Sequence, residues 1–109
     1  ITYSLPPAPT VTTNDATNVN NNSATLNSTV NPNGNSTTVL YRYGTSNVSC
    51  SSLSSVTSSI NIGSGVIDVS PNLRNIATLS ASTTYYFCAV GTNAGGTTFG
   101  NVLNFTTLP

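Results

Sequence analysis

The sequence predicts an all-β domain, an antiparallel seven-stranded β-sandwich, and three observations support this. First, apolar and polar residues alternate in several short runs, which is the two-residue period of a half-buried strand. Second, turn-forming clusters interrupt these runs, most densely at residues 31–34 (Asn-Pro-Asn-Gly) and 93–96 (Asn-Ala-Gly-Gly). Third, no long segment keeps the apolar period of a helix. Short antiparallel strands separated by such turns are typical of a sandwich.

The strands are expected where the alternation is clearest. In chain order these runs are residues 24–30, 39–43, 85–90 and 102–105. The turn at 93–96 is suited to a hairpin between the last two runs. The sandwich itself is expected over residues 8–109, and residues 1–7 form an N-terminal extension that precedes it.

Several of these segments resemble, in order and spacing, the fibronectin type III-like modules of bacterial extracellular proteins. They are residues 8–11, 24–34, 41–45, 92–100 and 105–107. Leu79, Thr83 and Tyr85 match the family's Leu-x-Pro-x-Thr-x-Tyr corner, with Ala81 where proline is usual. The resemblance implies a first strand beginning near residue 8, and it makes Leu79, Tyr85 and Phe87 core or corner residues. The chain departs from the family in lacking the usual tryptophan and in carrying a long Ser-rich insert at residues 45–64.

The cysteines Cys50 and Cys88 are the whole sulfur content of the chain. In an extracellular setting a disulfide between them is the natural interpretation, contributing on the order of 4 kcal/mol, whereas buried free thiols would suit a cytosolic protein. If Tyr85 and Phe87 face the core, Cys88 faces outward. The disulfide would then fix the insert to the outer face of its sheet. Leu40, Tyr86 and Val90 share that face, and we expect the insert or a neighbouring molecule to cover them.

The charge of the chain excludes several classes of function. Only 4% of the 109 residues are charged, and they are Arg42, Arg74, Asp15 and Asp68. So few cations cannot neutralise a run of phosphates, so we expect no nucleic-acid partner, and no apolar run is long enough for membrane insertion. There is no His or Lys, which removes the Ser-His-Asp triad and the usual zinc sites.

We therefore expect no enzyme, no cofactor and no metal site. A glycosidase could use Asp15 and Asp68 only if the fold brought both carboxylates together. Asn14, Asp15 and Asn18 could supply oxygen ligands to calcium, but a plain turn is favoured because the cluster has a single carboxylate.

The N-terminal extension suggests a function in assembly. Ile1, Tyr3 and Leu5 alternate like a strand that has no hairpin partner. The segment is either a linker fragment or a strand that pairs with the next subunit. From the second alternative, together with the uncharged surface, we predict a non-catalytic structural subunit of an extracellular filament that polymerises head to tail with itself. The other candidate is a spacer, adhesion or carbohydrate-binding module from a tandem-repeat adhesin or a secreted hydrolase.

The surface is rich in hydroxyls and amides, with 16 Ser, 19 Thr and 16 Asn. This composition contains sequons for N-linked glycans, which would suit an extracellular or cell-surface location, and unmodified surface Asn is the alternative. The sequons begin at Asn21, Asn27, Asn35, Asn47 and Asn104.

Overall fold

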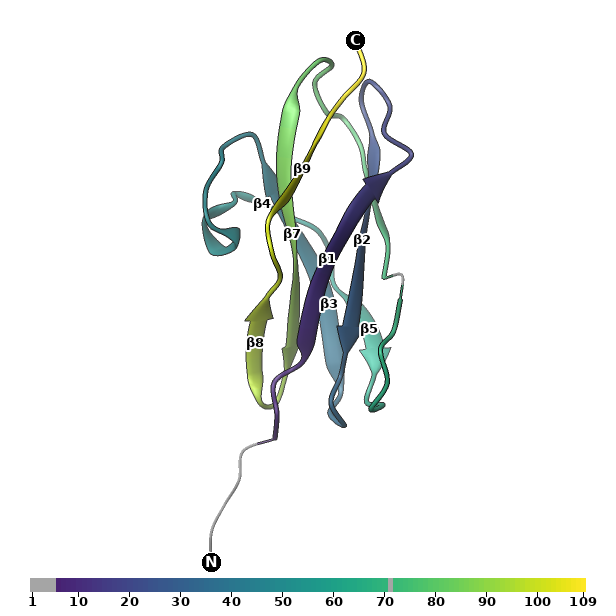
Figure 1. The fold of residues 1–109 in the computed structure, drawn as a ribbon, viewed down its shortest axis with the longest axis vertical. Helices are drawn as coiled ribbons and strands as arrows, with labels where there is room; N and C mark the ends of the chain where they lie inside the picture. Colours follow the sequence, from purple (N-terminus) through teal and green to yellow (C-terminus); the bar gives the residue numbers. More distant parts are fainter. Residues whose placement is uncertain (1–5, 71) are drawn as a thin grey trace, which may run out of the picture.

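The protein is an all-β sandwich of two antiparallel sheets, seen in a computed structural model that describes residues 6–70 and 72–109 (Figure 1). The smaller sheet has the order β1-β2-β6, with strands Thr10–Thr17, Ala24–Asn31 and Arg74–Ile76. The larger sheet has the order β4-β3-β7-β8, with strands Ser55–Val56, Thr37–Gly44, Thr84–Asn93 and Gly96–Phe99. In it, β5 (Ile60–Gly63) also pairs with β3, and β9 (Leu103–Thr106) also pairs with β7. The predicted fold class is confirmed.

The strand count differs from the predicted seven, because the described residues form nine strands. Strands β4, β5 and β6 were not predicted, and they are edge strands of two to four residues. Part of the predicted insert therefore belongs to the sheet. Strands β8 and β9 both pair with β7, and the pairing along β7 is interrupted between Phe99 and Leu103. The predicted extension strand of Ile1, Tyr3 and Leu5 lies outside the described residues.

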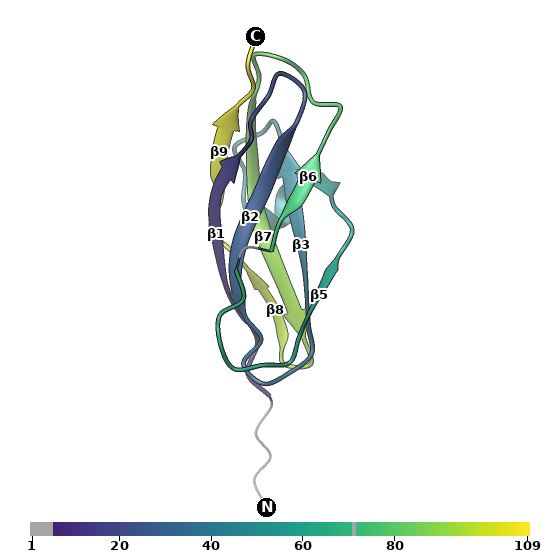
Figure 2. The same ribbon diagram turned by 90° about the vertical axis from the view of Figure 1, so that its right-hand side faces the viewer.

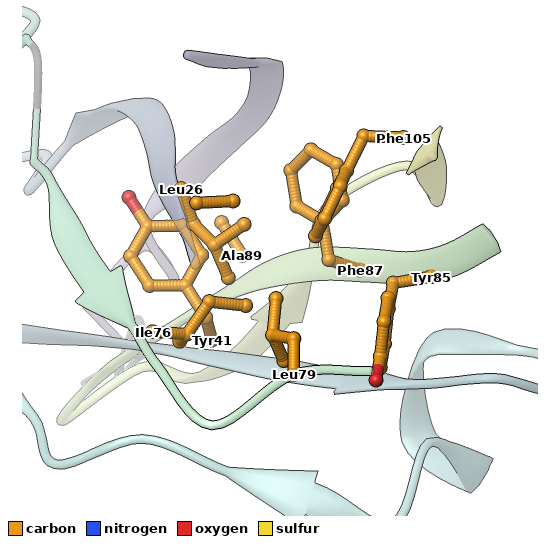
Figure 3. Close-up of a cluster of buried hydrophobic side chains, with 9 residues drawn as sticks. Leu26, Tyr41, Ile76, Leu79, Tyr85, Phe87, Ala89 and Phe105 are labelled. Atoms are coloured by element: carbon orange, nitrogen blue, oxygen red, sulfur yellow. The ribbon is translucent and has the colours of Figure 1, made fainter. Parts of the chain in front are cut away.

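The main core lies between the sheets, and apolar side chains from both sheets meet there (Figure 3). Its buried members are Ala24, Leu26, Tyr41, Ile76, Leu79, Tyr85, Phe87, Ala89 and Phe105. Phe105 stacks on Tyr85, with ring centroids 5.7 Å apart, and meets Phe87 at 5.8 Å in a tilted arrangement. Figure 2 shows the layers with the smaller sheet toward the viewer and β3 and β7 behind it.

The corner before β7 is held by Tyr85. Its hydroxyl accepts a hydrogen bond of 2.8 Å from the backbone N–H of Ser80. This bond to backbone a few residues upstream is the tyrosine corner of immunoglobulin-like sandwiches. The corner positions the start of β7, the strand that carries Cys88.

Thr13 joins the two sheets at the break between β8 and β9. Its hydroxyl accepts a hydrogen bond of 3.1 Å from the N–H of Ala89, and its own N–H donates to Asn101 Oδ1 at 3.1 Å. A Cβ at Gly100 would lie 2.5 Å from the Thr13 hydroxyl, so only glycine fits there. The buried polar groups left by the interrupted strand are thus satisfied across the sandwich.

A buried hydrogen-bond network lies within the core around Tyr41. The Tyr41 hydroxyl donates to the Asn72 carbonyl and lies 2.8 Å from Ser28 Oγ. Burial raises the pKa of Tyr41 to about 12, and the Ser28 hydrogen bond and the charge of Arg74 act in the opposite direction. The network ties the segment before β6 to β2, because the Asn72 N–H also donates to the Ser28 carbonyl at 3.1 Å.

Candidate functional site

The main departure from a plain sandwich is the loop of residues 45–54, called here the insert loop. It leaves the end of β3 and returns as β4, and the pair Tyr43 and Ser55 closes its base. Figure 1 shows it projecting at the left, beside β4. Most of its side chains are exposed, but Cys50 in the short 3-10 helix η1 (Cys50–Ser52) and Leu53 are buried, with exposed fractions of 6% and 1%.

The disulfide between Cys50 and Cys88 attaches the insert loop to the outer face of the larger sheet. The Cα atoms of the pair are 5.8 Å apart. The bonded cysteines form a second small apolar cluster with Leu53 and Val90, and Leu40, Tyr86 and Val102 pack against it. This face would otherwise be open to solvent, so the insert loop supplies a cover for it, in the arrangement expected from the phase of β7.

Both arginines of the chain hydrogen-bond to carbonyls of the connection between β3 and β5. Arg42 Nε donates to the Leu53 carbonyl at 3.1 Å, at the end of the insert loop. Arg74, from the smaller sheet, donates through Nη2 to the Ser59 carbonyl at 3.0 Å and through Nε to the Ser58 carbonyl at 3.4 Å. Hydrogen bonds from charged donors are among the stronger ones. The scarce cations therefore position this connection.

A cavity of about 200 Å³ opens between the insert loop and the end of β3. It is called here the insert pocket, and its lining residues are Gly44, Thr45, Ser46, Val48, Ser52, Leu53 and Ser54. Four of these residues carry hydroxyls, two are apolar, and none is charged. Hydroxyls both donate and accept hydrogen bonds, so this lining suits polar groups without a net charge.

The acidic residues considered for catalysis and metal binding lie apart from this pocket. Within residues 6–70 and 72–109, no cluster of His, Cys, Asp and Glu could hold a metal ion. Asp15 follows Asn14, which pairs with Asn27, whereas Asp68 precedes Val69, which pairs with Val30. Asn27 and Val30 are about 10 Å apart along β2. Asp15 and Asp68 lie beyond these two positions, on opposite sides, so the two aspartates are farther apart still.

The residues considered for calcium do not form a cage of ligands. Asn14 donates its amide to the Thr29 hydroxyl at 2.9 Å, which occupies it within the sheet. Asn18 has a positive φ of 50°, which asparagine tolerates in a tight turn. The plain turn favoured from the sequence is only partly right, because Asn14 and Asp15 belong to β1 and the turn begins at Asn18.

The predicted glycan sites differ in their exposure to solvent. Asn21, Asn47 and Asn104 are exposed and Asn35 is partly buried. Asn27 is only 8% exposed, and its amide nitrogen donates to the Asp15 carbonyl and to Thr17 Oγ1, both at 3.0 Å. The prediction for Asn27 needs correction: the irregularity in β1 after Asn14 folds over this outward position and occupies the nitrogen that a glycan would use.

The chain is similar in fold to solved sensor domains. No family model matches the sequence, and no curated protein matches it. A shorter form of the sensor domain of the anti-sigma factor RsgI4 from Pseudobacteroides cellulosolvens is 22% identical, with a TM-score of 0.68 over 92% of this chain and 94% of that one. A longer form is 25% identical, with a TM-score of 0.59 over 92% and 89% of the respective chains. A solution structure of the same domain is 23% identical, with a TM-score of 0.58 over 91% and 74%.

The predicted filament subunit, with its head-to-tail homopolymer and donated strand, is wrong. Three solved structures that match over most of the chain are of a sensor domain, not of a filament or pilus subunit. The prediction relied on Ile1, Tyr3 and Leu5, which lie outside the described residues, and on a surface poor in charge. Low charge permits association but does not specify it, so it could not distinguish a polymer from a sensor domain.

Sequence reasoning did not find the insert pocket. It identified the insert and its anchoring cysteine, but it predicted no ligand-binding site there. The only signal was a Ser-rich stretch interrupted by single apolar residues at Val48 and Leu53, and many surface loops share that composition.

Proposed function

We propose that this chain is an extracellular recognition domain that senses a small uncharged polar ligand in the insert pocket. The observation that carries the proposal is a neutral, hydroxyl-lined cavity built by a loop that is fixed to a rigid sheet. Loops held by such a scaffold are where binding residues gather in many folds. The likeness to sensor domains supports the proposal, since a domain of similar fold is the sensor domain of the anti-sigma factor RsgI4.

The chemistry of the pocket determines the kind of ligand. Thr45, Ser46 and the serines at 52 and 54 supply hydroxyls, while Val48 and Leu53 supply apolar surface. Typical small-molecule sites combine a few polar groups with apolar walls. Because the lining holds no charged residue, nothing in the pocket would balance a charge on the ligand. A neutral ligand that presents hydroxyls or amides fits best.

Recognition without catalysis fits the same lining. A serine nucleophile needs an adjacent base, and no titratable side chain lines the pocket.

The tyrosine corner and the sequence resemblance support a module of the fibronectin type III type. The disulfide is the kind of bond that persists outside the cytosol. In the described part of the chain, no helix is long and apolar enough to cross a membrane.

The proposal is tested by calorimetric binding with matched probes: neutral polyols, hexoses and primary amides, each set against its carboxylate or amine counterpart. We expect at least one neutral probe to bind and its charged counterpart to bind more weakly. Ser46→Ala, which removes a pocket hydroxyl, should weaken binding about 2- to 10-fold, the effect of losing one hydrogen bond. Ser51→Ala, an exposed neighbour outside the lining, is the matched control and should leave the affinity unchanged. A preference for charged probes, or equal effects of both variants, would refute the proposal.

A further inference from the structure

We propose that the Cys50–Cys88 disulfide is a redox switch for the insert pocket: its reduction releases residues 45–54 from the larger sheet and leaves the sandwich folded. The proposal rests on the function proposed above, because it concerns the regulation of the same site. Three observations support it. The disulfide lies within the pocket-forming loop, few other contacts hold that loop, and the main core contains neither the disulfide nor the loop.

The disulfide lies at the centre of the pocket-forming loop. The pocket is lined by residues on both sides of Cys50, at 44–48 and at 52–54. Cys88 lies in the middle of β7, paired with Arg42 of β3. A single covalent bond therefore fixes both walls of the pocket relative to the sheet, and the position of Cys50 determines whether the pocket has its shape.

Few other contacts would hold the loop after reduction. Leu53 is its remaining buried apolar residue. The Arg42 hydrogen bond to the Leu53 carbonyl is its side-chain bond to β3. Ordering the backbone costs conformational entropy at every residue, and residues 45–49 are all exposed, so they bury nothing that offsets this cost. Without the covalent bond, these contacts cannot offset the entropy of an ordered loop.

The sandwich does not depend on the loop in the same way. The main core lies on the opposite face of the larger sheet and includes neither cysteine. The pairing of β3 with β7 runs from Thr38 to Gly44 and is made by backbone hydrogen bonds. Opening the loop would uncover Val90 and its neighbours in the small outer cluster, but it would not open the main core.

The chemical step is thiol–disulfide exchange with a dithiol reductant, either a small molecule or a protein. A thiolate of the reductant attacks one sulfur of the pair, the protein S–S bond breaks, and a mixed disulfide forms. The second thiolate of the reductant then attacks the reductant's own sulfur in the mixed disulfide and releases the protein thiolate. The products are two protein thiols and an oxidised reductant. Both cysteines are buried, but Cys50, which lies on the loop, is 6% exposed and Cys88 is 0% exposed, so we expect the attack at Cys50.

Hydrogen exchange measured by mass spectrometry tests this switch without any ligand. In the oxidised protein, the N–H groups of Ser52 and Leu53 are protected by bonds to the Ser49 and Cys50 carbonyls. We expect reduction by dithiothreitol to speed exchange in residues 45–54 to nearly the rate of an unfolded chain, while β2 and the β3–β7 pair exchange faster only through the lower global stability and stay protected. The thiol-free variant Cys50→Ala/Cys88→Ala should show the fast loop without reductant, and reductant should not affect it.

Two results would overturn the switch. The loop could keep its protection after reduction, which would mean that Leu53 and Arg42 hold it. Alternatively, protection could be lost throughout the chain, which would mean that loop and sandwich unfold together. Failure of the proposed function is a different result, because it is seen as an absence of neutral-probe binding by the oxidised protein.

Discussion

Replacing both cysteines, as Cys50→Ala/Cys88→Ala, should lower the free energy of unfolding by about 4 kcal/mol. The bond joins residues separated by 38 positions, and a cross-link of that span restricts the unfolded chain by about this amount in the chain-entropy model. For a domain of this size the loss corresponds to a fall in Tm of roughly 15–30 °C. Domains typically have about 5–15 kcal/mol of stability, so we expect the variant to fold. Urea unfolding of the oxidised protein and the variant measures the difference.

The reduced wild-type protein is the control for this variant. Its stability should match that of the alanine variant to within about 1 kcal/mol, because both lack the covalent bond and differ by small buried atoms. A loss below about 1 kcal/mol in the variant would contradict the account. It would mean that the bond restricts the unfolded chain far less than its span implies.

Replacing Tyr41 with phenylalanine should cost about 2–3 kcal/mol at neutral pH. The change leaves the Ser28 hydroxyl and the Asn72 carbonyl without the partner that they share in the core, and an unsatisfied buried polar group costs about 1–3 kcal/mol. The ring itself stays, so no cavity forms. Tyr43→Phe, on the same strand but partly exposed, is the matched control and should cost less than about 0.5 kcal/mol. Equal losses in the two variants would contradict the network.

The same hydroxyl makes the stability depend on alkaline pH. Burial raises the pKa of Tyr41 to about 12 in the folded protein, whereas tyrosine in an unfolded chain has a pKa of about 10. Below pH 10 both states hold the proton. Between pH 10 and 12 the unfolded state releases it first, so stability falls as pH rises. The advantage of the wild type over Tyr41→Phe should therefore shrink by about 2 kcal/mol across this interval. If the stability difference between the wild type and Tyr41→Phe stays constant from pH 8 to 12, ionisation of Tyr41 is not the source of the pH dependence.

Most of what could be predicted about the site came from the alternation of inward and outward side chains along β7. Tyr85 and Phe87 point into the main core, so Cys88, which follows Phe87, had to point outward, and the structure has this geometry. Alternation also located β2, β3 and β7 to within a few residues, because these central strands bury one face. The Gly-rich turn at 94–95 joins β7 to β8, where a hairpin was expected.

The short edge strands and the pocket could not be predicted from the sequence. Strands β4 and β6 have two and three residues, too few for alternation to differ from chance. Asn27 shows a further limit: its position on the outward side of β2 was evident, but the fold of β1 over it was not. The pocket depends on where Cys50 places its neighbours, which is a tertiary property.

The uncharged surface has a different meaning once the edges are known. Lysines on edge strands often prevent proteins from pairing edge to edge, and this chain has none. Here the edge strands β4, β5 and β6 are very short, and the longer edge strand β1 has an irregularity after Asn14; short edges and bulges are other means of limiting such pairing. A neutral, hydroxyl-rich surface is therefore compatible with a domain that remains a single recognition unit.

The most direct test of the account is a map of backbone amide shifts in the oxidised protein as the tightest-binding neutral probe is added. The account predicts that the largest changes lie within residues 44–54, with smaller ones near Cys88 on β7. Changes that centre elsewhere, for example on the hairpin turn at 93–96, or no saturable change in residues 44–54, would contradict the insert pocket as the sensing site.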